Sequence, residues 1–141
     1  QPMTRQEREA YSEVLRPNGQ ILCYPVITSG IYAHRDSFIN LLGSEPDQNQ
    51  LHQLSLENTV NANTPPTFIW HTQTDDAVPV ENSLLMVSAL QTHHIPMEFH
   101  LYPTGSHGLA LGDDTTTVDP RMMNSDITGW SDLAVRFVKN L

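Results

Sequence analysis

Three side chains capable of acid–base chemistry follow two apolar runs of the sequence. Asp75 and Asp76 come shortly after the run 67–71, and His107 follows the run 97–102. A carboxylate that holds one imidazole nitrogen fixes the tautomer of the ring and stabilises its protonated form. The other nitrogen can then take a proton from a nucleophile and return it to a leaving group. These residue types predict the acid and the base of a nucleophile–His–Asp triad, with either aspartate as the acid.

The loop around the histidine reads Gly105-Ser106-His107-Gly108. Glycine lets a backbone turn sharply, so the imidazole can point into a pocket. The neighbouring Ser106 is not expected to be the nucleophile, because adjacent side chains rarely face each other. The alternative interpretation is structural: a loop histidine kept for turn packing, and aspartates that serve the turn and cap the next helix.

Three apolar runs are expected to form the strands that position these loops. The run 21–27 is continuous, which is typical of a strand covered on both faces, and Pro25 predicts that pairing ends near Tyr24. The run 67–71 is bounded by prolines and polar residues, and the run 97–102 alternates as a strand near a sheet edge does. Strands that alternate with helical patterns predict an α/β fold with a parallel sheet.

Helical periodicity fills the intervals between and after these strands. Helices are expected over 80–94 and 126–141, with one or two short helices in the excursion 28–63 and a capped helix over about 4–13. The excursion is expected to bury Phe38, Ile39, Leu41, Leu42, Leu51, Leu54 and Leu56. The apolar positions of the helix over 80–94 are Val80, Leu84, Leu85, Val87, Ala89 and Leu90. Those of the last helix are Ile127, Trp130, Leu133, Ala134, Phe137, Val138 and Leu141.

Three strings of the sequence resemble the carboxyl-terminal half of α/β-hydrolases, in particular the small bacterial acetyl esterases related to acetylxylan esterases. They are CYPVITSG (23–30), FIWHTQTDDAVPVENSLL (68–85) and FHLYPTGSHGLAL (99–111). The resemblance, which runs from about residue 20 to 141, implies a partial α/β-hydrolase fold: the last three parallel strands with flanking helices, without the first strands and the nucleophile turn.

The resemblance also implies a domain organisation. Residues 1–141 would be the carboxyl-terminal portion of a single α/β-hydrolase domain, with 1–20 as a linker and helix downstream of the missing nucleophile region. The excursion 28–63 would lie near the substrate pocket. Tyr32, His34 and Arg35 at its start either border that pocket or belong to a solvated loop, and no substrate-binding residue is assigned.

In the family pattern, Asp-x-x-Val-Pro carries the acid and Gly-x-His-Gly carries the base, so the resemblance assigns these roles to Asp75 and His107, with Asp76 as the alternative acid. It implies a serine esterase that cleaves acetyl or similarly short acyl esters, also on carbohydrates, without a metal or an organic cofactor. No serine of the chain has the flanking glycines of the nucleophile turn. The nucleophile is therefore expected outside the chain, which alone should be inactive. A lipase or peptidase, and a non-enzymatic interaction domain or fragment with half the fold, are the alternatives.

Charge and composition restrict the partners. Sixteen acidic against seven basic residues give a net charge of −9, which disfavours nucleic acid as a partner. The longest apolar runs, about seven residues, are far shorter than a membrane span, and the single Cys23 allows no internal disulfide or cysteine-based zinc site. The first twenty residues do not resemble a signal peptide, so we expect a cytoplasmic protein. Its expected partners are a small ester substrate and the missing amino-terminal half.

Overall fold

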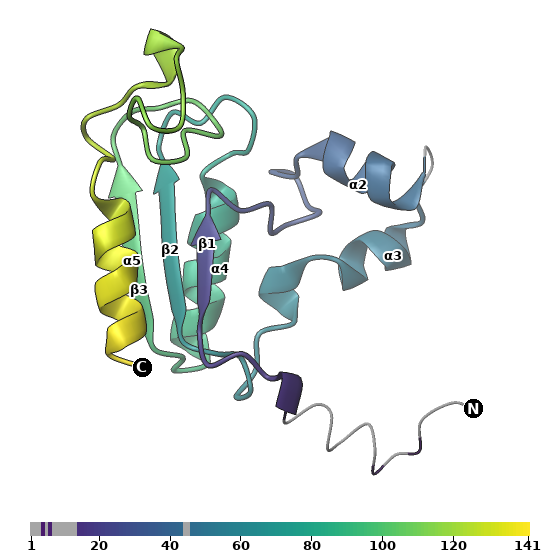
Figure 1. The fold of residues 1–141 in the computed structure, drawn as a ribbon. Coiled ribbons are helices and arrows are strands. Elements are labelled where there is room, and N and C mark those ends of the chain that lie inside the picture. The colour runs from purple at the N-terminus through teal and green to yellow at the C-terminus, as the bar shows by residue number, and fades with distance from the viewer. Residues whose placement is uncertain (1–3, 5, 7–13, 44–45) are drawn as a thin grey trace.

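The computed structural model describes residues 4, 6, 14–43 and 46–141. Its centre is a parallel sheet of β1 (Gln20–Cys23), β2 (Thr67–Thr72) and β3 (Met97–Tyr102) in the order β1-β2-β3 (Figure 1). All six residues of β2 are buried, as expected for the middle strand. The α/β architecture with a parallel sheet, predicted from the sequence, is confirmed. Pairing of β1 ends one residue before Tyr24, whose φ of 37° turns the chain out of the ladder.

Two helices cover the two faces of the sheet, α4 (Glu81–Thr92) and α5 (Trp130–Lys139) (Figure 1). Because side chains alternate along a strand, Ile69 packs with Met86 and Leu90 of α4. Its neighbours Phe68 and Trp70 pack on the other side in a second cluster: Phe68, Trp70, Leu109, Ile127 and Ala134. Thus β2 joins both cores, and its last residues lead directly into the loop that carries Asp75.

The buried face of α4 differs from the one that its apolar periodicity predicts. Asn82 and Ser83 are fully buried, whereas Leu84 and Leu85 are 43% and 36% exposed. The helix is turned this way because both buried polar side chains find hydrogen-bond partners inside the protein, which an apolar pattern cannot indicate. In α5 the predicted face is correct as far as Phe137, but Val138 and Leu141 are half exposed.

The excursion between β1 and β2 contains α2 (Arg35–Leu42), α3 (Gln48–Gln53) and the 3₁₀ turn η1 (Leu56–Asn58). Phe38 and Leu51 are buried as predicted, and Leu42 and Leu54 are half-buried. The prediction is wrong for three positions: Ile39, Leu41 and Leu56 are 42%, 66% and 42% exposed. Of its residues α2 turns only Phe38 fully into the core, and η1 turns none. The helix predicted over about 4–13 falls almost entirely outside the described residues.

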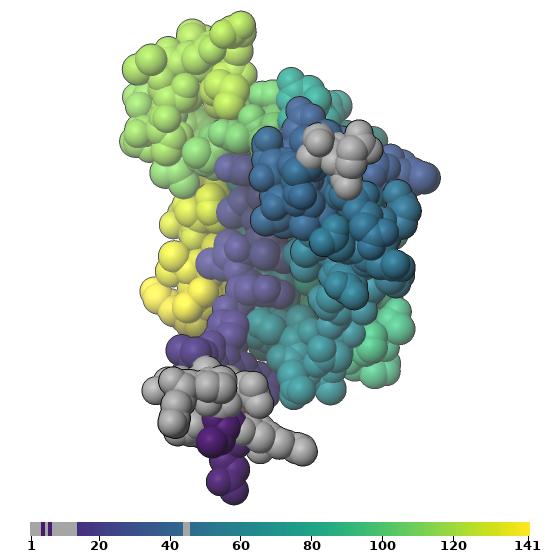
Figure 2. Space-filling view, turned by 90° about the vertical axis from the view of Figure 1, so that its right-hand side faces the viewer, coloured from purple at the N-terminus to yellow at the C-terminus, as the bar shows by residue number. Residues whose placement is uncertain are grey.

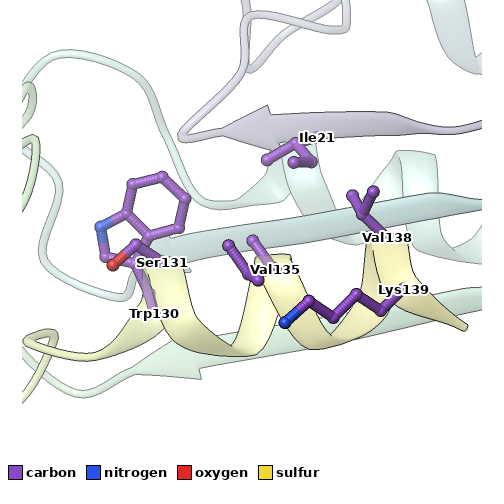
Figure 3. Close-up of a pocket in the computed structure, with 7 residues that line it drawn as sticks. Ile21, Trp130, Ser131, Val135, Val138 and Lys139 are labelled. Atoms are coloured by element: carbon purple, nitrogen blue, oxygen red, sulfur yellow. The ribbon is translucent and has the colours of Figure 1, made fainter.

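One edge of the sheet and part of α5 form an apolar groove of about 390 Å³ (Figure 3). Within the described residues β1 pairs on one side only, with β2. Its Ile21 is 43% exposed and faces Val135 and Val138 of α5, which are about half exposed (Figure 3). Figure 2 shows this purple strand segment at the surface, between the blue excursion and the yellow α5. In the described part of the chain, no helix has the length and apolarity needed to cross a bilayer.

Candidate active site

The loops that follow β2 and β3 meet above the carboxyl ends of the strands (Figure 1). There Nδ1 of His107 lies 2.8 Å from Oδ2 of Asp75. The Asp75 side chain has no exposed surface, whereas the His107 side chain is 33% exposed. The structure therefore brings together Asp75 and His107, which the sequence singled out. The carboxylate is buried, and the imidazole is partly exposed to solvent.

The loop after β2 prepares the carboxylate to remain ionised. Oδ1 of Asp75 accepts the backbone N–H groups of Ala77 at 2.9 Å and Val78 at 2.8 Å. Burial alone would raise the pKa of Asp75, but these two donors and His107 outweigh burial and hold that pKa below its ordinary value. An ionised carboxylate accepts a proton-bearing nitrogen, so His107 carries its hydrogen on Nδ1.

Two threonines, one at the end of β2 and one in the loop that follows it, form hydrogen bonds with the backbone just before His107. The carbonyl of Gly105 accepts the hydroxyl of Thr72 at 2.8 Å, and its N–H donates to Thr74 Oγ1 at 2.9 Å. Gly105 has a φ of 147°, and a Cβ there would lie 2.8 Å from Cγ2 of Thr72. The glycine that the sequence associates with a sharp turn is thus required by both conformation and space.

The second nitrogen of the His107 ring is available for chemistry. Across the residues that the structure describes, no hydrogen bond engages Nε2. The ring forms a T-shaped contact with that of Tyr24, the residue after β1, with centroids 4.8 Å apart and planes at 72°. With Nδ1–H bound to Asp75, Nε2 holds a free electron pair, which is the arrangement that a general base needs.

The other sequence candidates have different positions. Asp76 accepts the backbone N–H of His107 at 3.0 Å, whereas the ring is hydrogen-bonded to Asp75. Ser106 points to Sδ of Met122, at 3.5 Å. Leaving aside Ser12 and Ser44, which lie outside the described residues, no serine is hydrogen-bonded to His107.

The excursion residues that the sequence left open hold the excursion in place: Arg35 and His34 bond within it, and Tyr32 bonds to α4. Arg35 donates to the carbonyl oxygens of Ser29 and Gly30 at 3.0 and 2.8 Å. Nδ1 of His34 lies 2.9 Å from Ser37 Oγ, and the Tyr32 carbonyl accepts from Asn82. No group of three or more metal-ligating side chains occurs in the described part of the chain.

Two polar residues near the site were missed by the sequence reasoning. His71 on β2 is fully buried, and its Nε2 lies 3.2 Å from Oδ2 of Asp75. Its Nδ1 lies 2.8 Å from Oγ of Ser83 in α4. The available signal was a histidine inside an apolar strand, four residues before the aspartate.

Comparison with protein families shows to which family the chain belongs. The model of the prolyl oligopeptidase family matches residues 29–124, which include Asp75 and His107. The chain belongs to this family. The match covers more than half of the sequence and includes the loops after β2 and β3.

Two relatives of the chain have names that refer to xylan. Endo-1,4-beta-xylanase B of Butyrivibrio fibrisolvens is 50% identical over 99 residues, which are 70% of this chain and 16% of that protein. Acetylxylan esterase of Xylanibacter ruminicola is 37% identical over 103 residues, which are 70% of this chain and 22% of that protein. The chain thus spans less than a quarter of the length of these relatives.

Solved structures show the same fold. An acetyl ester-xyloside bifunctional hydrolase from Caldicellulosiruptor lactoaceticus superposes with a TM-score of 0.76 at 43% identity, over 89% of this chain and 43% of that one. A sugar hydrolase from Lactococcus lactis gives 0.73 at 34% identity, over 89% and 50%. The three-stranded sheet with its helices is therefore part of an α/β-hydrolase fold, as the sequence resemblance implied.

Proposed function

We propose that the polypeptide that contains this chain is a carboxylic ester hydrolase that removes acetyl or similarly short acyl groups, with xylan-type carbohydrate esters as its substrates. The observation that carries the reaction type is the buried, ionised Asp75 carboxylate against Nδ1 of His107, which leaves Nε2 free. The substrate class is supported by the similarity to an acetylxylan esterase and to an acetyl ester-xyloside hydrolase.

In the proposed reaction a serine oxygen attacks the ester carbonyl while Nε2 of His107 takes the serine proton. His107 returns this proton to the leaving alcohol, and water then releases the acid by the reverse sequence. Asp75 keeps its charge throughout and supports the imidazolium electrostatically. The serine and the oxyanion donors belong to a segment outside this chain in this proposal.

The apolar groove beside β1 supports the proposal that a segment preceding this chain packs there and completes the enzyme. An unpaired strand edge next to exposed valines and isoleucine favours association with another strand and helix. The chain covers 43% and 50% of the two solved structures described above, which is consistent with about half of the domain lying elsewhere.

The test uses the coding sequence extended upstream until it includes the nucleophile turn. The extended protein should hydrolyse p-nitrophenyl acetate and release acetate from acetylated xylan, and its His107→Ala variant should not. Residues 1–141 alone should hydrolyse p-nitrophenyl acetate no faster than their own His107→Ala variant. An extended protein without esterase activity contradicts the proposal.

A peptidase is the second candidate, because the matching family is that of a prolyl oligopeptidase. The acid and base do not distinguish an ester from an amide, so the same extended protein should be assayed with an acyl-proline p-nitroanilide. Cleavage of the anilide with no cleavage of acetyl esters would assign the chain to a peptidase.

A further inference from the structure

A second histidine contacts the same carboxylate oxygen as His107. Nε2 of His71 lies 3.2 Å and Nδ1 of His107 lies 2.8 Å from Oδ2 of Asp75. The His71 side chain has no exposed surface, so no substrate can touch it. An effect of His71 on a reaction must therefore act through the residues that it contacts, and of these Asp75 is the one bonded to His107.

The hydrogen bonds of His71 define which of its nitrogens carries the hydrogen. Nε2 also lies 3.0 Å from the carbonyl oxygen of Val78. Carbonyl and carboxylate oxygens only accept hydrogen bonds, so Nε2 is the donor. Nδ1 lies 2.8 Å from the hydroxyl of Ser83, which can donate to it. Burial lowers the pKa of His71 more than its bonds to Val78 and Asp75 raise that pKa, so the ring is neutral at neutral pH.

We propose that His71 is a positioning residue for the triad acid: its Nε2–H, which is hydrogen-bonded to the Val78 carbonyl, also faces Oδ2 of Asp75 at 3.2 Å and orients this oxygen toward His107. The Ser83 hydroxyl supports that tautomer by donating to Nδ1. The inference rests on the proposed function of the Asp75–His107 pair. Two backbone donors fix Oδ1 of the carboxylate, and His71 and His107 share Oδ2. The carboxylate therefore cannot rotate away when His107 becomes protonated.

The neutral state of His71 matters for this role. A protonated ring would compete with the imidazolium of His107 for the charge of Asp75, whereas a neutral N–H donor only orients the carboxylate. The titratable groups that face Asp75 are His71 from β2, His107 from the loop after β3 and Tyr24 from the end of β1. Loss of the His71 N–H removes a donor that lies 3.2 Å from Oδ2 of Asp75, so the carboxylate becomes more basic.

The first experiment measures ester hydrolysis by the upstream-extended protein. His71→Leu should lower kcat by about 100-fold with little change in KM, because the triad acid is misplaced but the substrate pocket is intact. The acid limb of its pH–rate profile should move to higher pH.

His71→Gln should restore most of kcat, since the glutamine amide can donate from nearly the position of Nε2. Ser83→Ala should lower kcat by about tenfold.

Thr67→Val is the matched control. Thr67 is fully buried at the opposite end of β2, where its hydroxyl makes two hydrogen bonds, with Gln20 and Pro65. This variant should lose stability but keep the kcat and the pH profile of the parent protein. If His71→Leu behaves as Thr67→Val does, His71 is only a structural residue and the inference is wrong.

The second experiment is independent of activity. Nitrogen-15 NMR of histidine-labelled protein at pH 7–8 should show the Nε2–H tautomer of His71, and Ser83→Ala should keep it, because both oxygens that face Nε2 only accept hydrogen bonds. An Nδ1–H tautomer in the parent protein overturns the inference. A protein that hydrolyses no ester contradicts the proposed function, whereas the NMR result still decides the hydrogen-bond arrangement.

Discussion

The two oxygens of the Asp75 carboxylate have different tasks. Oδ1 accepts two backbone N–H groups of its own loop, which bind it whether or not a substrate is present. Oδ2 is left for the two histidines, His107 at 2.8 Å and His71 at 3.2 Å. The loop thereby fixes Oδ1, and Oδ2 remains free to stabilise the protonated form of His107.

The two neighbouring aspartates should therefore respond differently to the same substitution. Asp75→Asn should lower kcat of the extended protein by on the order of 10³- to 10⁴-fold, because the amide cannot stabilise an imidazolium and favours the wrong tautomer. Asp76→Asn should change kcat by less than about tenfold, because an amide oxygen can still accept the backbone N–H of His107. Steady-state kinetics on p-nitrophenyl acetate measures both, and equal losses would contradict the assignment of Asp75 as the triad acid.

His71 should also make stability depend on pH. Its pKa is lowered in the folded state, mainly by burial, from an unfolded value of about 6.5. As the pH falls below about 6.5 the unfolded chain binds a proton that the folded chain does not, so the free energy of unfolding decreases. Urea unfolding between pH 5 and 8 should show this loss, and His71→Gln should remove part of the slope. The same slope in both proteins would contradict a buried neutral histidine.

Among the elements, α4 does more than cover the sheet, because its first turn joins three segments. Oδ1 of Asn82 accepts the backbone N–H groups of Ile27 and Thr28, both at 2.9 Å. Its amide donates to the carbonyls of Tyr32 and Pro79, also at 2.9 Å. One buried side chain thus holds the excursion after β1 to the loop that carries Asp75.

Asn82→Ala should lower the free energy of unfolding by about 3 kcal/mol, because two buried N–H groups, of Ile27 and Thr28, and the partly buried Tyr32 carbonyl lose their partner. Leu84→Ala is the control in the same helix turn: Leu84 is 43% exposed, so its removal should cost less than about 1 kcal/mol. Urea unfolding at pH 7 compares the two variants. A larger loss for Leu84→Ala would support the apolar face that the sequence predicts and contradict the role of Asn82.

The elements also show how far the sequence could be interpreted alone. The strand predicted over 97–102 has the observed bounds, and the strand over 67–71 is one residue longer, because prolines and polar residues mark their ends. The face of α4 could not be predicted, since Asn82 and Ser83 are buried by hydrogen bonds to residues distant in the sequence.

The same limit applies to the site. The contact of Asp75 with His107 follows from two loops at the carboxyl ends of neighbouring parallel strands, which the order of elements predicts. The His71–Ser83 hydrogen bond depends on how α4 is rotated against β2, and residue spacing carries no information about that rotation.

At the scale of the whole molecule, the acid–base pair and the apolar groove occupy different parts of the chain. The pair lies above the carboxyl ends of the strands, whereas the groove runs along β1 and α5 (Figures 1 and 3). A segment that pairs with β1 and covers Val135 and Val138 would continue the sheet beside Tyr24, which contacts His107. In the proposed enzyme, the segment that completes the sheet would thus also complete the catalytic centre.

This coupling predicts that a charge placed in the groove destabilises the extended protein but not residues 1–141 alone. Val135 is 52% exposed in the chain, so Val135→Asp should change the free energy of unfolding of residues 1–141 by less than about 0.5 kcal/mol. In the extended protein the same aspartate would be buried against the preceding segment, at a cost of about 2 kcal/mol or more. Its esterase activity at 37 °C should fall with the folded fraction.

Val118→Asp is the matched control, because Val118 is 95% exposed and does not line the groove. It should be neutral both in residues 1–141 and in the extended protein. Urea unfolding of the six proteins gives the comparison. An equal effect of Val135→Asp in the two contexts would mean that the groove stays open to solvent in the extended protein, and the nucleophile segment would then have to reach His107 without pairing to β1.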